Sequence, residues 1–266
     1  MEHLIKKWRE ITGSVKNKHI YLFLDFDGTL TFIRRDPKKV KLSVATARIL
    51  KQLASMKAVS IAVISGRGLS DIRKRVGVAG IVYAGNHGLE IKAPGLRHVV
   101  PEVLKAKKTI QEISGRLKKE YRSFEGVYIE DKGLTLSVHF RMVDKRRLKE
   151  AERIFKNIIG AREAGGKVIT TGGKKVWEVR PPVKWDKGKT ARYLLGQERK
   201  KVKGRTIPFY IGDDRTDEDA FRLLRRSGYT VKVGRKDRQP TFADYYLNDT
   251  REVRKFLKMI YMLKGG

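Results

Sequence analysis

Short apolar runs alternate with segments of helical periodicity over most of the chain. The candidate strands are residues 20–24, 59–64, 81–84, 207–211, 230–233 and 245–247. Within residues 42–56, apolar side chains recur at the spacing of one helix face. Strands that alternate with helices are typical of an α/β fold with a mainly parallel sheet. We therefore predict this fold class.

The rhythm changes between residues 90 and 181. Residues 134–141 alternate strictly between apolar and polar side chains. This pattern is typical of a strand in a sheet that has one open face. Residues 128–130 and 176–180 have the composition of strands that could pair with it. We expect a small sheet here, separate from the parallel one.

Two helical segments, at residues 102–121 and 144–159, complete this region as an α+β unit. Pro181-Pro182 marks its end, because neither residue readily continues a helix or a strand. We predict two domains: a core of residues 1–89 and 182–266, and an inserted α+β domain of residues 90–181.

Composition places the chain among globular proteins. Its 266 residues are enough for a substantial core, and no segment is apolar for long enough to cross a membrane. The first residues mix charged and apolar side chains and lack the continuous apolar stretch of a signal peptide. Cysteine is absent, so neither disulfides nor thiol chemistry is expected. We expect a monomeric cytoplasmic protein that does not bind membranes.

The charge balance is strongly basic. The chain has 61 Lys and Arg against 29 Asp and Glu, a formal net charge of +32. Such a surface attracts polyanions, but the basic residues are spread along the whole chain and no motif of a nucleic-acid-binding domain occurs. We expect nonspecific polyanion affinity and no specific nucleic-acid partner. The charged fraction of 34%, without cysteine, also favours a thermophilic origin.

A pair of carboxylates, Asp25 and Asp27, follows the first candidate strand and precedes Gly28-Thr29. In open α/β sheets, ligands bind outside the carboxyl ends of the strands. Two carboxylates at this spacing can divide the work of phosphoryl transfer, in which one attacks phosphorus and the other transfers protons. An isolated pair of this kind is more often a simple polar turn, so this interpretation needs support from other segments.

More carboxylates follow a later strand, namely Asp213 and Asp214, with Asp217 close behind. Several carboxylates near one strand end are suited to a hard cation, and Mg²⁺ is the usual choice alongside phosphate. The competing explanation is helix capping, because residues 216–219 read as a capping box that starts at Thr216. We assign capping to Asp219, favour it for Glu218, and reject it for Asp213 and Asp214, which precede the expected cap.

Two further polar residues lie where phosphate chemistry needs them. Lys187 falls in the first turn of a helix that opens at Asp186, where a cation opposes the macrodipole at a cost of roughly 0.3–1 kcal/mol. A lysine held there can bridge a carboxylate nucleophile and a phosphate; the alternative is an ordinary solvated lysine. Ser65, at the end of the second strand, can offer a hydroxyl and a nearby N–H to a phosphate oxygen. Neither residue is decisive alone.

Together these elements resemble the haloacid dehalogenase-like (HAD) superfamily. Residues 25–29 resemble its first motif, Ser65 its second, Lys187 its third and residues 212–214 its fourth. Their order and their positions at strand ends agree with that superfamily. The resemblance implies a Rossmann-like core with an inserted cap domain and catalytic roles for Ser65 and Lys187.

The same resemblance implies the chemistry of the carboxylates. Asp25 would be the nucleophile that forms an aspartyl-phosphate, and Asp27 the general acid and base. Mg²⁺ would be held by Asp25, by the main-chain carbonyl of Asp27 and by Asp213, with Asp214 adjacent or acting through water. An acid at position 27 points to phosphatases rather than to dehalogenases.

Within this superfamily, the chain is similar to trehalose-6-phosphate phosphatases. The shared segments are residues 65–67, 85–90, 132–136, 139–141, 177–181 and 212–219. There are two departures: Phe140 stands where tyrosine is common, and Asp186 where asparagine often precedes the lysine. The resemblance implies Mg²⁺-dependent hydrolysis of trehalose 6-phosphate, a small sugar phosphate, to trehalose and phosphate.

The resemblance also assigns substrate binding to polar side chains in both domains. From the pattern alone, the open face of the inserted sheet could equally carry ordinary cross-strand ion pairs, which contribute little. The resemblance favours sugar binding most for Arg141 and Glu178, whereas His87 could equally be a buried turn residue. The predicted substrate-binding residues are Arg67, Asn86, His87, Glu130, His139, Arg141, Glu178 and Arg180.

Three alternatives compete with this function. The first is another phosphatase of the superfamily, acting on sucrose phosphate, mannosyl-3-phosphoglycerate or phosphoglycolate. The second is a nonspecific nucleic-acid-binding protein, which the charge alone suggests. The third is a phosphatase fold that has lost catalysis and binds a partner; the complete set of expected catalytic residues argues against it.

Overall fold

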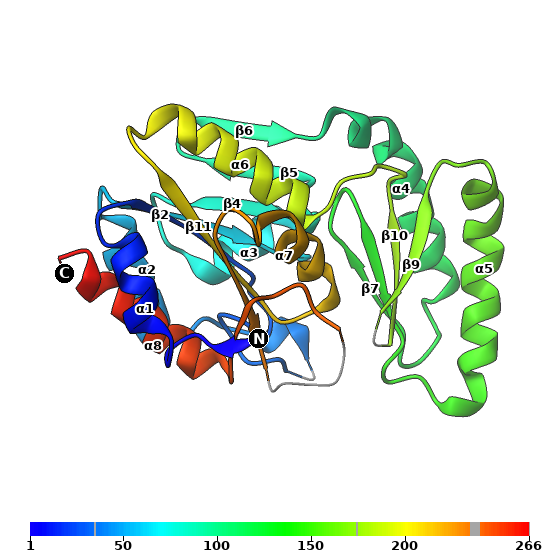
Figure 1. Cartoon of the computed structure of the whole chain (residues 1–266). Helices are drawn as coiled ribbons and strands as arrows, with labels where there is room; N and C mark the ends of the chain where they lie inside the picture. The colour runs from blue at the N-terminus through cyan, green and yellow to red at the C-terminus, as the bar shows by residue number, and fades with distance from the viewer. Residues whose placement is uncertain (35, 174, 235–239, 266) are drawn as a thin grey trace. The chain divides into compact units, whose positions relative to one another are not determined.

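The computed structural model describes residues 1–34, 36–173, 175–234 and 240–265. The chain divides into two compact units. Met1–Arg97 and Trp185–Gly266 form the first, named the core unit, and His98–Lys184 forms the second, named the cap unit. Each unit has its own sheet and its own apolar cluster, so each is described by itself (Figure 1).

The core unit is built on a nine-stranded sheet. Its strands are β1 (Glu2–His3), β2 (His19–Leu24), β3 (Val59–Ile64), β4 (Val82–Gly85), β5 (Glu90–Ala93), β6 (Leu96–Val99), β11 (Thr206–Gly212), β12 (Tyr229–Val233) and β13 (Tyr245–Leu247). Their order in the sheet is β1-β13-β12-β11-β2-β3-β4-β5-β6. Every pair from β1 to β4 is parallel, and β5 is antiparallel to β4. The predicted α/β class with a mainly parallel sheet is confirmed.

Helices cover both faces of this sheet (Figure 1). Successive residues of a strand point to opposite faces, so Leu22 packs in one apolar cluster and Phe23 in the other. The helices of the Leu22 side are α1 (Trp8–Val15), α2 (Val44–Ala54), α3 (Leu69–Val76) and α8 (Thr250–Leu263), and those of the Phe23 side are α6 (Lys187–Lys201) and α7 (Glu218–Leu224).

Short polar signals fix where several of these helices begin and end. The Ser43 hydroxyl accepts the Thr46 N–H at 3.1 Å and starts α2. Gly77, with a φ of 61°, adopts the left-handed conformation that ends α3. The Asp186 carboxylate accepts the Lys189 N–H at 2.8 Å and starts α6. Because of this cap, the first residue of α6 is Lys187.

The cap unit has a four-stranded antiparallel sheet in the order β7-β8-β10-β9. Its elements are α4 (Pro101–Glu120), β7 (Tyr128–Asp131), β8 (Leu136–His139), α5 (Leu148–Ala164), β9 (Ile169–Gly173) and β10 (Val176–Arg180). Leu136, Val138 and Val179 pack with apolar side chains of both helices. The alternating strand therefore has one face in the core of this unit, as the sequence predicts.

The units divide at positions that differ from those expected from the sequence. The first division falls after Arg97, inside β6, rather than after residue 89. The reason is that β5 pairs with β4, with Gly85 opposite Glu90, and so extends the core sheet. The second division falls after Lys184, close to the Pro181-Pro182 boundary.

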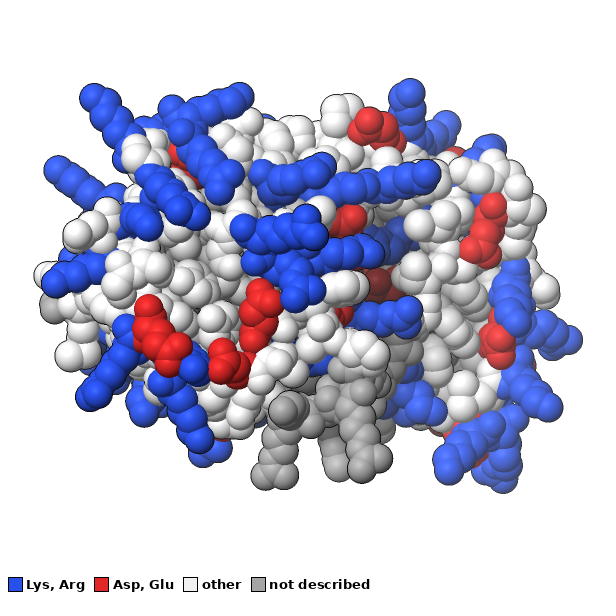
Figure 2. Space-filling model, in the orientation of Figure 1, with Lys and Arg blue, Asp and Glu red and all other residues white. Residues whose placement is uncertain are grey.

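The surface agrees with the dispersed charge of the sequence. Figure 2 shows Lys and Arg side chains spread over most of the visible face, with fewer Asp and Glu among them. Among the described residues, no helix has the length and apolar character that a membrane span requires.

The aromatic centre of the core unit allows a test of this packing. Phe209 is fully buried. Its ring stacks on that of Tyr229, with centroids 4.6 Å apart, and packs tilted against that of Phe256, with centroids 5.4 Å apart. We expect Phe209→Ala to lower the free energy of unfolding by about 3–5 kcal/mol, because the lost ring leaves a cavity. Chemical denaturation measures this change. Phe32→Ala, at a residue that is 57% exposed, is the control and should change stability by less than about 0.5 kcal/mol; equal losses would contradict the packing.

Candidate active site

Three neighbouring strands of the core sheet end at the same edge. β2 is parallel to β11 on one side and to β3 on the other, and its last residue, Leu24, lies opposite Ile211 and Val63, each one residue before its strand ends. Asp25 follows β2, Ser65 follows β3 and Asp213 follows β11. The topology therefore brings these three predicted site residues to the carboxyl ends of three neighbouring strands.

Lys187 connects these strand ends electrostatically. Its Nζ donates to Asp25 Oδ1 at 2.8 Å and to Asp217 Oδ1 at 2.9 Å, and lies 3.9 Å from Asp214 Oδ1. Only 2% of the Lys187 side chain is exposed. Burial lowers the pKa of this ammonium, but Asp217 and Asp25 prevail and raise it well above its usual value. The alternative of a solvated lysine is therefore wrong.

Asp217 is the residue that holds this arrangement together. Besides Lys187, its Oδ1 accepts the hydroxyl of Tyr210 at 2.8 Å. Its Oδ2 accepts the N–H groups of Asp213 and Asp214, each at 3.1 Å. The side chain is fully buried. One carboxylate thus fixes both the lysine and the turn that carries the neighbouring acids.

The cap of this turn differs from the prediction. Asp214 is its N-cap: the carboxylate accepts the Thr216 N–H at 2.8 Å, and Asp217 accepts the Asp214 N–H in return. The prediction that Asp214 takes no part in capping is wrong, because the chain first forms a 3₁₀ turn, Arg215–Asp217, before α7 begins. The reciprocal capping box starts two residues earlier than expected.

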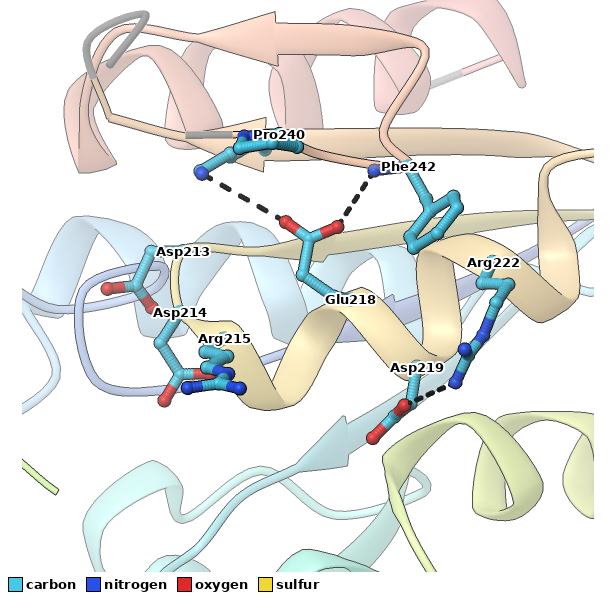
Figure 3. A pocket seen from close by; sticks show the side chains of 9 residues that line it. Asp213, Asp214, Arg215, Glu218, Asp219, Arg222, Pro240 and Phe242 are labelled. Atoms are coloured by element: carbon cyan, nitrogen blue, oxygen red, sulfur yellow. Dashed lines mark hydrogen bonds and ion pairs between the residues drawn. The ribbon is translucent and has the colours of Figure 1, made fainter. Parts of the chain in front are cut away.

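A pocket of about 780 Å³ lies beside this turn. In Figure 3, Asp213 and Asp214 lie at one end and the Asp219–Arg222 ion pair at the other. Glu218 lies between them and accepts the Phe242 N–H at 2.8 Å. Glu218 and Asp219 occupy the first turn of α7, but the capping box is made by Asp214 and Asp217. The capping role assigned to Asp219 and favoured for Glu218 is therefore wrong: Asp219 pairs with Arg222, and Glu218 anchors the segment that leads into β13.

The carboxylates can hold a divalent metal ion. Asp25, Asp213 and Asp217 each offer an oxygen, and these atoms lie within 4.8 Å of one another. Burial, with repulsion from neighbouring carboxylates, raises the pKa of Asp213 to about 7 and that of Asp25 well above its usual value. A cation would relieve this repulsion, and all the donors are hard oxygens. Gly28, with a φ of 88°, leaves the necessary space, because a Cβ there would lie 2.0 Å from Asp213 Oδ2.

Asp27 faces a different partner. Arg67 donates from Nε to Asp27 Oδ2 at 2.6 Å and from NH2 to Asp27 Oδ1 at 2.7 Å. The NH1 group of Arg67 donates to Asp71 at 3.0 Å, and Arg67 is 7% exposed. The main chain N–H of Arg67 also donates to Ser65 Oγ, at 3.2 Å. Arg67, predicted as a substrate-binding residue, thus directs its guanidinium at two carboxylates of the core unit.

Asn86 and His87 form the turn after β4. Asn86 is fully buried and donates from Nδ2 to Glu90 at 2.7 Å. His87 is 9% exposed and packs against Gly66, where a Cβ would lie 2.8 Å from the imidazole. Both residues have a positive φ, 51° and 58°, which is uncommon outside glycine. The buried-turn alternative given for His87 describes its placement in this structure, and Asn86 is buried in the same turn.

The remaining predicted residues lie in the cap unit. Glu178 Oε1 accepts Ser137 at 3.2 Å and Lys132 at 3.4 Å. On the neighbouring strands, His139 Nε2 lies 3.0 Å from Glu130 Oε2. Trp177 and Val179 pack with the helices, so Glu178 and Arg180 point to the opposite face. Arg141, just after β8, is exposed.

Lys132 is a member of this polar face that the sequence analysis did not single out. Its side chain is only 8% exposed, although it is a lysine in a lysine-rich chain. One signal could have identified Lys132 as a site residue: it begins the segment 132–136, which resembles trehalose-6-phosphate phosphatases. Composition could not distinguish it from the other lysines.

Comparisons with known proteins agree with this geometry. The profile of the family described as trehalose-phosphatase matches residues 23–251. Probable trehalose-phosphate phosphatase 4 of Oryza sativa subsp. japonica is 36% identical over 260 residues, which cover 95% of this chain and 69% of that protein. The Candida albicans trehalose-6-phosphate phosphatase C-terminal domain has a TM-score of 0.79 at 27% identity, with 98% of each chain covered.

A haloacid dehalogenase-like hydrolase from Bacteroides thetaiotaomicron shares the fold alone, with a TM-score of 0.60 at 16% identity over 92% of this chain and all of that one. The mainly parallel sheet, the helices on both of its faces and this likeness define the fold as HAD-like, with a Rossmann-like core. Within that class, the chain belongs to the trehalose-phosphatase family.

Asp217 gives a direct test of the site. We expect Asp217→Asn to lower the free energy of unfolding by about 3 kcal/mol or more, because an amide cannot balance the buried charge of Lys187. The phosphatase rate should fall at least about tenfold, since Lys187 and the 213–214 turn both lose their anchor. Denaturation and phosphate release measure the two effects.

Asp219→Asn is the matched control, because this acid pairs with Arg222 on an exposed part of α7. Its loss should change stability by less than about 1 kcal/mol. Similar stability in both variants would contradict the role given to Asp217.

Proposed function

We propose that this protein hydrolyses trehalose 6-phosphate to trehalose and inorganic phosphate through an aspartyl-phosphate on Asp25. The observation that carries the proposal is the 2.8 Å contact between Lys187 Nζ and Asp25 Oδ1 inside a buried carboxylate cluster. Burial raises the pKa of Asp25 and Lys187 opposes it by lowering that pKa, and a bound cation would lower it further, which would make the carboxylate available as a nucleophile. The substrate follows from the family to which the chain belongs.

Two proton transfers by Asp27 complete the reaction. In the first step, an Asp25 oxygen attacks phosphorus and the bond from phosphorus to the sugar oxygen breaks, while Asp27 donates a proton to that oxygen. In the second step, Asp27 takes a proton from water as the water attacks phosphorus. The bond to Asp25 then breaks, which releases phosphate and restores the carboxylate. Ser65 would donate a hydrogen bond to a phosphate oxygen.

Mg²⁺ is the cation that we assign to this cluster. We expect Asp25, Asp213 and the main-chain carbonyl of Asp27 to hold it. Asp217, whose two oxygens already accept four hydrogen bonds, would act by positioning the others, and Asp214 by capping the turn. When bound, the ion would offset the repulsion between the carboxylate nucleophile and the phosphate dianion.

The polar face of the cap sheet would bind the sugar. Sugar hydroxyls need fixed donors and acceptors, and hydrogen-bonded carboxylates and cations on one sheet provide them. We assign this role to Glu130, Lys132, His139, Arg141, Glu178 and Arg180. For Asn86 and His87, burial in the turn after β4 favours a structural role instead.

We further propose that the protein is monomeric and cytoplasmic, that it has a thermophilic origin, and that it binds polyanions without specificity. The dispersed cations visible in Figure 2 favour weak, salt-sensitive contacts over a defined nucleic-acid site.

The proposed reaction is tested by phosphate release from a panel of sugar phosphates, with Mg²⁺ and with EDTA. We expect turnover that strongly favours trehalose 6-phosphate and is lost when the metal is removed. Asp25→Asn should lose at least about 1,000-fold in rate, because the amide is not a nucleophile. Preference for another phosphate would retain the mechanism and exclude the substrate, while full activity of Asp25→Asn would exclude the mechanism.

Glu178 tests the sugar site separately from the chemistry. We expect Glu178→Gln to raise KM for trehalose 6-phosphate by about 10–100-fold with a smaller change in kcat, because a charged acceptor is worth about 1.5–3 kcal/mol. Turnover of p-nitrophenyl phosphate, which has no sugar, should be unchanged. Glu150→Gln, at an exposed acid of the cap unit paired with Arg147, is the control. A loss on both substrates would contradict a role in sugar recognition.

A further inference from the structure

A row of ion pairs leads from Asp27 through the buried Arg67 to helix α3. Arg67 binds both oxygens of Asp27, at 2.6 and 2.7 Å, and also contacts Asp71 at 3.0 Å. Asp71 in turn accepts Arg75 Nε at 2.6 Å. Exposure falls sharply along the first pair, from 37% for the Asp27 side chain to 8% for that of Arg67. The carboxylate is open to solvent while its partner is not.

The far end of this row is fixed to the backbone. Asp71 and Arg75 lie four residues apart on α3 and therefore on one face of the helix. Arg75 NH1 donates to the main-chain carbonyls of Lys38 and Val40. Burial raises the pKa of Asp71, but the hydrogen bonds from Arg75 and Arg67 prevail and lower it. Asp71 thus holds the guanidinium of Arg67 through NH1, while Nε and NH2 donate to Asp27.

This geometry fixes the plane of the Asp27 carboxylate. A guanidinium presents its N–H groups as a rigid planar fork, and two parallel bonds to one carboxylate define its orientation as well as its position. Each carboxylate oxygen can accept two hydrogen bonds, so the fork leaves acceptor capacity on both oxygens. Asp27 can therefore exchange a proton with a leaving group or with water while Arg67 holds it.

We propose that Arg67 is a positioning residue that orients Asp27 for both proton transfers, and that Asp71 holds Arg67 in place. The proposal rests on the proposed function, since it gives Arg67 a role in that reaction. It replaces direct contact with the substrate, the role expected from the sequence. Three donors of the guanidinium are directed at Asp27 and Asp71, and the side chain is almost entirely enclosed in the core unit.

The test compares kcat and KM in the full-length protein. Arg67→Ala should lower kcat by about 100-fold, the loss expected from a misplaced catalytic group, with KM within about threefold of the wild-type value. Arg67→Lys should recover only part of kcat, because an ammonium cannot hold both oxygens. Asp71→Asn should lower kcat by about tenfold. Arg73→Ala, at an exposed arginine of the same helix, is the control and should leave both constants unchanged.

A double-mutant cycle separates positioning from other roles. If Arg67 acts through Asp27, the double variant of Asp27→Asn and Arg67→Ala should be no slower than Asp27→Asn alone. Independent, multiplying losses would overturn the proposal. A rise in KM with kcat retained would also overturn it, in favour of substrate binding by Arg67.

Beryllium trifluoride, a mimic of the aspartyl-phosphate, supplies a readout other than turnover. Arg67→Ala should bind it in the presence of Mg²⁺ as tightly as the wild type, measured by calorimetry, because Asp25 and Lys187 are untouched. Loss of this binding would overturn the proposal by showing general damage to the site. An inactive wild type would overturn the proposed function itself, whereas an active wild type with normal kcat in Arg67→Ala would overturn only the positioning role.

Discussion

The buried contact of Lys187 with two carboxylates is the interaction on which the site depends. An ammonium with 2% exposure would be strongly destabilising without compensation. Asp25 and Asp217 supply that compensation, and Asp217 is itself stabilised by Tyr210 and by two main-chain N–H groups. Each charge in this group therefore needs the others. The cost of burial therefore keeps Asp25, Lys187 and the turn after β11 in one arrangement.

The sheet topology already places these charged groups close together. Asp25 and the 213–214 turn leave neighbouring parallel strands, and Lys187 is the first residue of α6, whose cap at Asp186 fixes its direction. Glycines at the closest approaches leave room for the charged groups. A Cβ at Gly212 would lie 2.2 Å from the Asp217 carboxyl carbon, and one at Gly28 would lie 2.0 Å from Asp213 Oδ2. The insertion of residues between β6 and α6 leaves these relations intact, because both sides of each contact belong to the core unit.

The sequence was a good guide where the signal was local. Apolar runs that end in Asp25, Ser65 or Asp213 predicted the sheet and the edge at which the site forms. It was a poor guide to partnerships between distant segments. The pairing of Arg67 with Asp27 spans 40 residues, and the hydrogen bond from Lys187 to Asp217 depends on where α6 begins. β1 has only two residues and is a strand solely because β13 lies beside it, so no periodicity could have revealed it.

The two carboxylates of the first motif, Asp25 and Asp27, lie two residues apart but differ in environment because they have different partners. Asp25 is buried and accepts a hydrogen bond from Lys187. Lys187 also donates to the buried Asp217, so its removal would leave both acids without their cation. Asp27, two residues later, remains accessible and is held by a guanidinium that belongs to a separate row of ion pairs. A nucleophile must remain ionised and fixed, while a proton carrier must reach solvent and leaving group in turn. In the proposed reaction, two separate networks of ion pairs would let Asp25 and Asp27, two residues of one chemical type, meet these opposite requirements.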